Sequence, residues 1–129
     1  MDYTHKYDQN YNGPALPVVE VQIRSLAENG TVIVRQALVD SGADATMIPL
    51  NDLEAVSARR VDRKRLRGIS GISYQVDIFE VSLNIGPFYV PKIFAVADRQ
   101  SDDMILGRDV LNLFITTLDG LAYMVHLSQ

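Results

Sequence analysis

Alternating apolar and polar residues predict a β-hairpin near the start of the chain. In LPVVEVQIRS, residues 16–25, Val and Ile alternate with Glu, Gln and Arg, which is the period of a half-buried strand. AENG, residues 27–30, has the composition of a turn, and TVIVRQALV, residues 31–39, is rich in β-branched residues. We expect these two strands to pair and to present Asp40 at the end of the second one.

The rest of the pattern predicts short strands with one or two short helices. Leu50, Leu53 and Val56 lie at helical spacing after a proline, so a helix is predicted over residues 50–61. Apolar runs bounded by Gly, Pro and Asp predict a short helix over residues 107–114 and strands over residues 72–85, 88–97, 104–106, 115–118 and 121–127. Many short strands with few helices are typical of an all-β barrel or sandwich.

Two local signals refine the later strands. Pro91 falls inside the strand predicted over residues 88–97, and a proline there favours a sheet edge or a bulge. Asp119-Gly120 is a good type I′ pair, so we expect a tight hairpin turn between the last two strands.

The N-terminal segment differs from the rest of the chain. Residues 1–14 are polar and Tyr-rich, show no clear periodicity, and close in Asn-Gly-Pro. We therefore expect a flexible tail over residues 1–14 and a single domain over residues 15–129. A chain of 129 residues with 47% hydrophobic content is large enough to bury its own core.

Composition narrows the possible classes of function. The chain has no Cys, which rules out disulfides, a thiolate nucleophile and a Cys-based metal site. Its net charge of −4 gives no overall reason to expect nucleic acid as a partner. The N-terminus lacks the apolar run of a signal peptide, and no stretch of 18 apolar residues occurs. We expect no membrane partner and a cytoplasmic location.

One cluster departs from this charge balance. RRVDRKRLR, residues 59–67, holds six of the 12 Lys and Arg residues of the chain. Such a run can bind an acidic partner or nucleic acid, or it can form a solvated arm that leads into the next hairpin. The solvated arm is the preferred interpretation, because no aromatic residue is interleaved with the cations.

Asp40 is the residue that most needs an explanation. It follows the apolar run QALV directly and precedes Ser41 and Gly42, after which a second apolar run begins. Burying a carboxylate beside such residues costs free energy, so Asp40 needs a partner or a catalytic task. Ser41 lacks the Gly-x-Ser-x-Gly context of a hydrolase nucleophile, and neither His5 nor His126 is tied to it. The acidic residues do not continue a metal-loop pattern, so no metal or cofactor is expected.

Three segments carry a resemblance to a known family. LVDSGADATMIP, residues 38–49, is similar to the catalytic loop of retropepsin-like aspartic proteases. RGISGI, residues 67–72, resembles their Gly-rich flap tip, and ILGRDVL, residues 105–111, resembles the segment that backs the active site. The resemblance spans about residues 18–127 and implies a small β-barrel fold with one half-site in each chain.

The resemblance implies a role for Asp40 and a partner for it. Asp40 would be the catalytic aspartate, and because the chain has one such motif, the second carboxylate would come from a homodimer. The two carboxylates would share a proton, so that one activates a water while the other donates a proton to the scissile carbonyl. The implied function is an aspartic endopeptidase that cuts protein or peptide substrates at apolar residues. The alternative is a non-catalytic peptide-binding or dimerisation module on the same fold.

The resemblance also assigns roles to neighbouring residues. Ser41, Gly42 and Ala43 would complete the active-site loop, with Ser41 bonded across the dimer axis and Gly42 allowing close approach of the substrate backbone. Asp44 would bind the substrate backbone and pair with Arg108 as a structural brace. The remaining substrate-binding positions would be the flap and the pocket-lining residues, Gly68, Ile69, Ser70, Gly71, Leu38, Met47 and Ile105.

Two positions depart from the family pattern. The flap has Ser70 where viral members usually have Gly, which bears on flap mobility. Asp109 replaces the usual Asn after the Arg, which bears on the hydrogen bonds around Arg108. Ordinary structural roles remain open for these residues: a turn serine at Ser41, a plain hairpin turn at residues 68–71, and core packing for the apolar positions.

Overall fold

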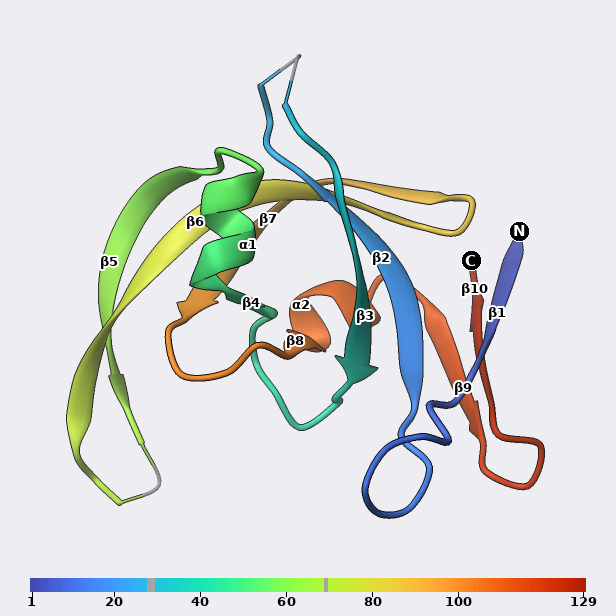
Figure 1. Cartoon of the computed structure of the whole chain (residues 1–129). Helices are drawn as coiled ribbons and strands as arrows, with labels where there is room; N and C mark the ends of the chain where they lie inside the picture. Colours follow the sequence, from blue (N-terminus) through green and yellow to red (C-terminus); the bar gives the residue numbers. More distant parts are fainter. Residues whose placement is uncertain (28–29, 69) are drawn as a thin grey trace.

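The computed structural model describes residues 1–27, 30–68 and 70–129, which fold mainly into β-strands (Figure 1). The elements in chain order are β1 (Asp2–Lys6), β2 (Val18–Arg24), β3 (Ile33–Val39), β4 (Met47–Pro49), α1 (Leu50–Ala55), β5 (Arg59–Arg67), β6 (Ser73–Ile85), β7 (Phe88–Asp98), β8 (Met104–Leu106), α2 (Arg108–Leu111), β9 (Ile115–Asp119) and β10 (Met124–Ser128).

The larger sheet closes on itself into a barrel. Its strand order is β2-β3-β8-β4-β7-β6-β5, and β2 also pairs with β6. Strand β6 makes both junctions possible because of its length: residues 73–80 pair with β5, and residues 82–84 pair with β2. The predicted all-β barrel with short helices is confirmed. The other sheet has the order β1-β10-β9.

The main core fills the barrel, and the first hairpin shows how the sequence builds it. Val19, Val21 and Ile23 are fully buried, whereas the residues between them are exposed or half-buried. Side chains on a strand alternate between its faces, so this pattern directs one face of β2 inward. The predicted hairpin of β2 and β3 is confirmed, and β3 ends at Val39, directly before Asp40.

A second apolar cluster lies apart from the main core. Val76, Ile78 and Val96 are buried there, on strands β6 and β7. Four half-buried residues pack against them: Ala45, Met47, Val61 and Leu66. Strand β6 therefore buries side chains on both faces, since the adjacent residues Phe79 and Val81 belong to the main core.

The predicted flexible tail is wrong for the first residues, which form strand β1. This strand pairs along its whole length with β10. Tyr3 packs over Gly86, where a Cβ would lie 2.3 Å from the ring, and the Tyr3 hydroxyl accepts a hydrogen bond from Glu20 N. Gly86 also has a positive φ of 55°, which favours glycine. Tyr3 and His5 are half-buried while Asp2, Thr4 and Lys6 are exposed, so β1 has one face packed against the protein.

The helix predicted over residues 50–61 is too long. Helix α1 ends at Ala55, and Ser57 adopts a positive φ of 56°, which cannot continue an α-helix. Residues 59–67, considered above as a solvated arm, form strand β5 instead, although most of their side chains are exposed.

The two local signals in the later strands have different outcomes. The ladder between β6 and β7 shifts register where Val81 faces Ile93 and Leu83 faces Val90, so the bulge predicted at Pro91 is confirmed. The prediction of a tight two-residue turn at Asp119-Gly120 is wrong. Asp119 pairs with Met124, so the four residues 120–123 form the connection between β9 and β10. The Asp119 side chain accepts a hydrogen bond from Ala122 N and so stabilises this longer loop.

Asp77 on β6 connects three parts of the molecule. Arg63 Nε on β5 and Arg99 Nη2 in the loop after β7 donate to its two carboxylate oxygens at 2.9 and 2.8 Å. Arg60 lies 3.8 Å from the same carboxylate. These hydrogen bonds, from Arg63 foremost and then Arg99, hold the pKa of Asp77 below its usual value.

We expect Asp77→Asn to lower the free energy of unfolding most at neutral pH. A carboxylate whose pKa is lowered in the folded state stabilises above its unfolded pKa of about 4, and this contribution is lost as pH falls through the folded value. Urea unfolding at pH 7 and at pH 3 tests this, with the exposed Asp2→Asn as control. A stability difference from wild type that is equally large at both pH values would contradict the role of the charge.

Candidate active site

Asp40 lies at the end of β3 in a loop, residues 40–46, that we call the Asp40 loop. Asp40 N donates to Leu106 O at 3.1 Å, so the start of the loop is anchored to β8. The Asp40 carboxylate accepts a hydrogen bond from Gly42 N at 2.9 Å, and Asp40 O accepts one from Ala43 N at 3.2 Å. These bonds fix the orientation of a half-buried carboxylate. A Cβ on Gly42 would lie only 3.2 Å from that carboxylate.

Thr46 and Asp109 anchor the other end of the Asp40 loop. Thr46 is fully buried, and its hydroxyl donates to Asp109 Oδ1 at 2.8 Å while its N–H donates to Asp109 Oδ2 at 3.1 Å. The same hydroxyl accepts a hydrogen bond from Gly107 N at 3.2 Å. The buried hydroxyl of Thr46 thereby has a donor and an acceptor partner, although Asp109 itself is exposed.

Neither residue is among the predicted site residues. Asp109 differs from the usual family Asn and is therefore recognised as unusual. Its partner Thr46 is not predicted to take part in the site. A single hydroxyl residue inside the apolar stretch around MIP is the signal that points to it.

Gly107 lets the loop and the start of α2 approach closely. A Cβ at Gly107 would lie 2.6 Å from the carbonyl carbon of Ala45 and 2.7 Å from its oxygen. The next residue, Arg108, donates its N–H to Ala43 O at 2.9 Å. The backbone of residues 107–108 therefore packs directly on the Asp40 loop, with no room for a side chain between them.

The Arg108 side chain contacts the outer side of the same loop. Its Nη1 donates to Ser41 O at 2.8 Å, and its Nη2 donates to the Asp44 carboxylate. Asp44 is highly exposed, so its other oxygen is open to solvent. The structure thus brings Asp40, Ser41, Asp44 and Arg108 together in one surface region.

Three of the predicted pocket residues form a row beside Asp40. Leu38 on β3 is in register with Ile105 on β8, which is in register with Met47 on β4. Directly paired residues share a face of the sheet, so these half-buried side chains lie on one surface. The row continues through Met47 to Val96 on β7, a member of the second apolar cluster.

A cavity of about 470 Å³ lies at the far end of this row. Its lining combines the apolar cluster with polar residues of the β7–β8 loop: Met47, Tyr74, Gln75, Val76, Ala97, Asp98, Arg99 and Gln100. The row and the cavity together form a surface that runs from Asp40 towards β6, apolar along the row and partly polar in the cavity.

The predicted flap lies at the turn between β5 and β6. Gly68 N donates to Ile72 O, and Gly71 N donates to Gly68 O, with a φ of 82° at Gly71. Gly68 is half-buried, Ser70 and Gly71 are exposed, and the predicted tip residue Ile69 lies outside the described residues. The turn and the Asp40 loop are well separated in Figure 1, so the structure does not bring the predicted flap onto Asp40.

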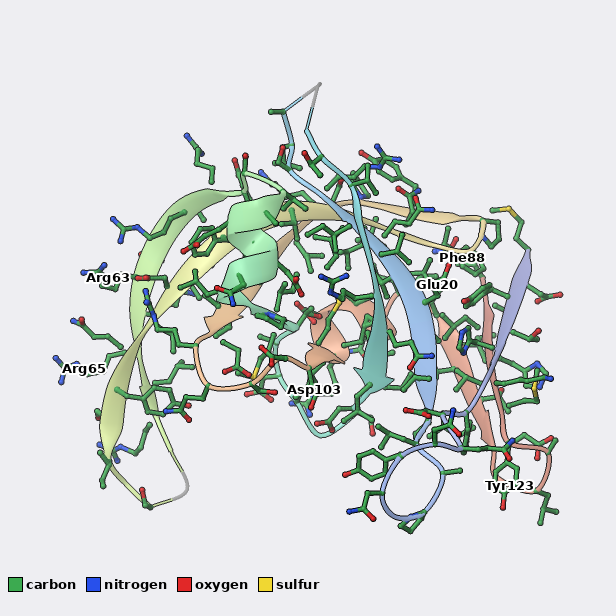
Figure 2. The ribbon with its side chains drawn as sticks, viewed as in Figure 1. Glu20, Arg63, Arg65, Phe88, Asp103 and Tyr123 are labelled. Atoms are coloured by element: carbon green, nitrogen blue, oxygen red, sulfur yellow. The ribbon has the colours of Figure 1, made fainter. Side chains whose placement is uncertain are left out.

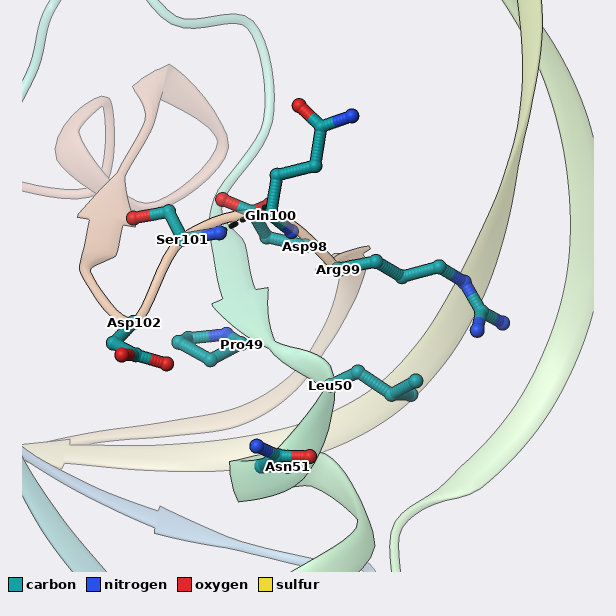
Figure 3. A pocket seen from close by; sticks show the side chains of 8 residues that line it. All are labelled: Pro49, Leu50, Asn51, Asp98, Arg99, Gln100, Ser101 and Asp102. Carbon is teal, nitrogen blue, oxygen red and sulfur yellow. Dashed lines mark hydrogen bonds between the residues drawn. The ribbon is translucent and has the colours of Figure 1, made fainter.

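A smaller hollow of about 240 Å³ lies between the start of α1 and the β7–β8 loop (Figure 3). Asp98 orders that loop by accepting hydrogen bonds from Gln100 N and Ser101 N. Figure 3 shows Arg99 pointing away from Pro49 and Asn51, which is consistent with its ion pair to Asp77. The hollow is therefore polar and shaped mainly by the loop.

The described part of the chain offers neither a metal-binding cluster nor a membrane-spanning helix. Residues 1–27, 30–68 and 70–129 contain no group of three or more His, Asp or Glu side chains placed to hold a metal ion. No helix formed by these residues is long and apolar enough to span a membrane.

One protein family matches most of the chain. The sequence profile of the gag-polyprotein putative aspartyl proteases matches residues 25–113. DNA damage-inducible protein 1 of Chaetomium globosum is 32% identical over 88 residues, which are 65% of this chain and 20% of that protein. The chain thus spans about a fifth of the length of this curated relative.

Solved structures show the same fold. A retropepsin-like aspartic protease from Rickettsia conorii matches with a TM-score of 0.62 at 16% identity, over 98% of this chain and 91% of that one. EIAV protease complexed with the inhibitor HBY-793 matches with a TM-score of 0.51 at 25% identity, over 79% and 90% of the two chains.

We expect Gly107→Ala to destabilise the fold by about 2–3 kcal/mol, because its methyl group has no room beside Ala45. Gly120→Ala is the matched control, since a Cβ there meets no atom within 4 Å. Urea unfolding of both variants measures the difference. Equal stability of the two variants would contradict the close packing of Gly107 on the loop.

Proposed function

The chain belongs to the gag-polyprotein putative aspartyl protease family and has the retropepsin-like fold, and from this premise we propose that it is a homodimeric aspartic endopeptidase. The observation that carries the proposal is the Asp40 carboxylate itself. It is held by Gly42 N–H at the end of β3, beside an apolar surface that suits a peptide.

The proposed mechanism needs two copies of Asp40. At hydrogen-bond distance two carboxylates do not both ionise readily, so the pair shares one proton, as in aspartic proteases generally. The ionised member removes a proton from a water, which attacks the scissile carbonyl carbon. The protonated member donates to the carbonyl oxygen, so that a tetrahedral diol forms. The C–N bond then breaks as the proton taken from the water passes to the amine nitrogen, and one diol hydroxyl returns its proton to the other carboxylate.

The proposed substrate is an extended peptide with apolar residues at the cleaved bond. The row of Leu38, Ile105 and Met47 offers apolar contacts next to Asp40, and the cavity bounded by Met47 and Val76 offers space beyond it. An extended peptide presents alternate side chains to such a surface. Asp44 would accept hydrogen bonds from the substrate backbone. The turn between β5 and β6 would have to move towards Asp40 for Gly68, Ser70 and Gly71 to cover the bound peptide.

A hollow beside Ser41 supports the proposed dimer. It has a volume of about 270 Å³ and a largely apolar lining: Val39, Ser41, Arg108, Leu111, Asn112, Phe114, Thr116 and Leu118. Leu118 is 50% exposed although it shares a face of the small sheet with the buried Val125. Thr116 Oγ1 is buried and, among the described residues, has no hydrogen-bond partner. A second copy seated here would cover the apolar groups and lie next to the Asp40 loop.

The small sheet offers an edge for the same contact. In the order β1-β10-β9, strand β1 covers one side of β10 within the chain, and β9 has a single neighbouring strand in the described part of the structure. Ile115, at the start of β9, is 68% exposed. An apolar edge strand favours association with another strand, which a two-fold axis beside β9 would supply.

We expect Asp40→Asn to abolish cleavage of a mixed peptide library between about pH 4 and 7, where wild type cuts next to apolar residues. Mass spectrometry of the products gives the sites. Asp103→Asn, at an exposed aspartate of the β7–β8 loop, is the control that should retain activity. Cleavage by Asp40→Asn at the wild-type rate would exclude the proposed mechanism. A dimeric wild type that cuts nothing would support a peptide-binding or dimerisation module instead.

We expect Leu118→Glu to shift the protein from dimer to monomer and to remove activity in parallel, because a charge would be buried against the second copy. Val34→Glu, on a 47% exposed residue of β3, is the control and should remain dimeric. Sedimentation velocity measures the oligomeric state. A wild type that cuts peptides while it sediments as a monomer would exclude the shared site.

A further inference from the structure

Strand β5 carries four arginines on one face. Arg63, Arg65 and Arg67 pair with Asp77, Gln75 and Ser73 of β6, which are two residues apart and therefore share a face. Arg60 pairs with Phe79 on that same face, beyond the irregularity in the ladder that separates it from Asp62. Figure 2 shows Arg63 and Arg65 projecting from β5 away from the barrel. We call Arg60, Arg63, Arg65 and Arg67 the arginine row.

The charge of this face is not balanced within the chain. On the face of β6 that adjoins the arginine row, Asp77 is the one acidic residue. Asp77 already forms ion pairs with Arg60, Arg63 and Arg99. In the described part of the chain, Arg65 and Arg67 form no ion pair. Strand β5 holds six of the 12 Lys and Arg but one of the 16 Asp and Glu, so six cations and 15 anions remain elsewhere. The excess of positive charge is therefore local.

Strand β5 is also an open edge of the barrel sheet. It lies last in the strand order, and within residues 1–27, 30–68 and 70–129 its one neighbour is β6. The backbone groups on its outer side thus have no strand to pair with. An extended peptide binds such an edge through main-chain hydrogen bonds, while its side chains determine specificity.

We propose that β5 binds an extended acidic segment of a partner protein as an added strand, with Asp or Glu at alternate positions of that segment facing the arginine row. Side chains two residues apart on a strand are separated by about 6.6–6.8 Å. Acidic residues at alternate positions of the added strand therefore match Arg63, Arg65 and Arg67 in spacing. This surface is separate from the proposed catalytic reaction and adds a partner to it.

The features of β5 favour a peptide over nucleic acid. No aromatic residue is interleaved with the cations, so β5 offers no stacking platform for bases. The chain outside β5 is strongly acidic and would repel a long polyanion, whereas a short segment experiences mainly the charges within a Debye length of about 8 Å. Cations on an edge strand also discourage pairing with a second copy of β5, and the same cations attract an acidic strand.

The test measures binding by fluorescence anisotropy, using residues 1–129 with Asp40→Asn so that the result does not depend on cleavage. The probe is a labelled 12-residue peptide of alternating Glu and Thr, and a Lys-Thr peptide serves as the charge control. We expect saturable binding of the Glu-Thr peptide at low salt and none of the Lys-Thr peptide. Adding Arg65→Glu and Arg67→Glu should weaken binding by about tenfold or more.

A matched variant and two further probes make the outcome decisive. Arg24→Glu with Lys92→Glu changes net charge equally on exposed residues outside β5, and it should bind the peptide as the parent does. Glu-Thr peptides methylated on alternate backbone nitrogens, in the two possible phases, should lose binding in the phase whose N–H groups face β5. Twelve-residue oligothymidine should compete weakly.

Three results would overturn the proposal. Equal weakening by both double variants would show that the attraction is not located at β5. Equal binding of both methylated peptides would exclude an added strand. Tighter binding of oligothymidine than of the acidic peptide would identify the arginine row as a nucleic-acid surface.

Discussion

The Asp40 loop depends on hydrogen-bond satisfaction between two distant segments of the chain. Thr46 is fully buried, and the partners of its N–H and hydroxyl come from residues 107–109. An unpaired buried polar group costs roughly 1–3 kcal/mol of stability. The Asp40 loop and α2 therefore pack in the one arrangement that gives Thr46 its hydrogen-bond partners. Gly107 permits that meeting, and it places Arg108 where its side chain reaches Asp44. The position of Asp40 follows from this packing and from the barrel that brings β3 beside β8.

Elements with strong local patterns could be predicted from the sequence. Strand β2 alternates apolar and polar residues, the segment of β3 is rich in β-branched residues, and the strand over residues 104–106 is an apolar run bounded by Asp and Gly. These strands lie in the barrel and lead directly into the candidate site. The position of Asp40 at a strand end, and of Gly107 after a short strand, could therefore be predicted from the sequence. The contact of Asp44 with Arg108 was expected from the family resemblance, since their separation of 64 residues gives no local signal.

What could not be predicted is decided by non-local contacts. Strand β1 is short and polar, and it is ordered by pairing with β10 and by Tyr3 packing on Gly86. The end of α1 depends on the positive φ of Ser57, a serine that no propensity marks as a stop. Thr46 stands out as a polar residue in an apolar stretch, but its pairing with Asp109 spans 63 residues and leaves no local signal in the sequence.

The separation between the Asp40 loop and its supports has a consequence for the order in which the chain matures. The ribosome makes residues 40–46 well before residues 106–109, which supply the anchoring bonds across gaps of more than 60 residues. Contacts so distant in sequence form late in folding. A growing polypeptide therefore exposes Asp40 in an unanchored segment, and the carboxylate acquires its fixed orientation only after α2 has been synthesised and docked. Translation itself thus delays the moment at which the proposed catalytic carboxylate is held in place.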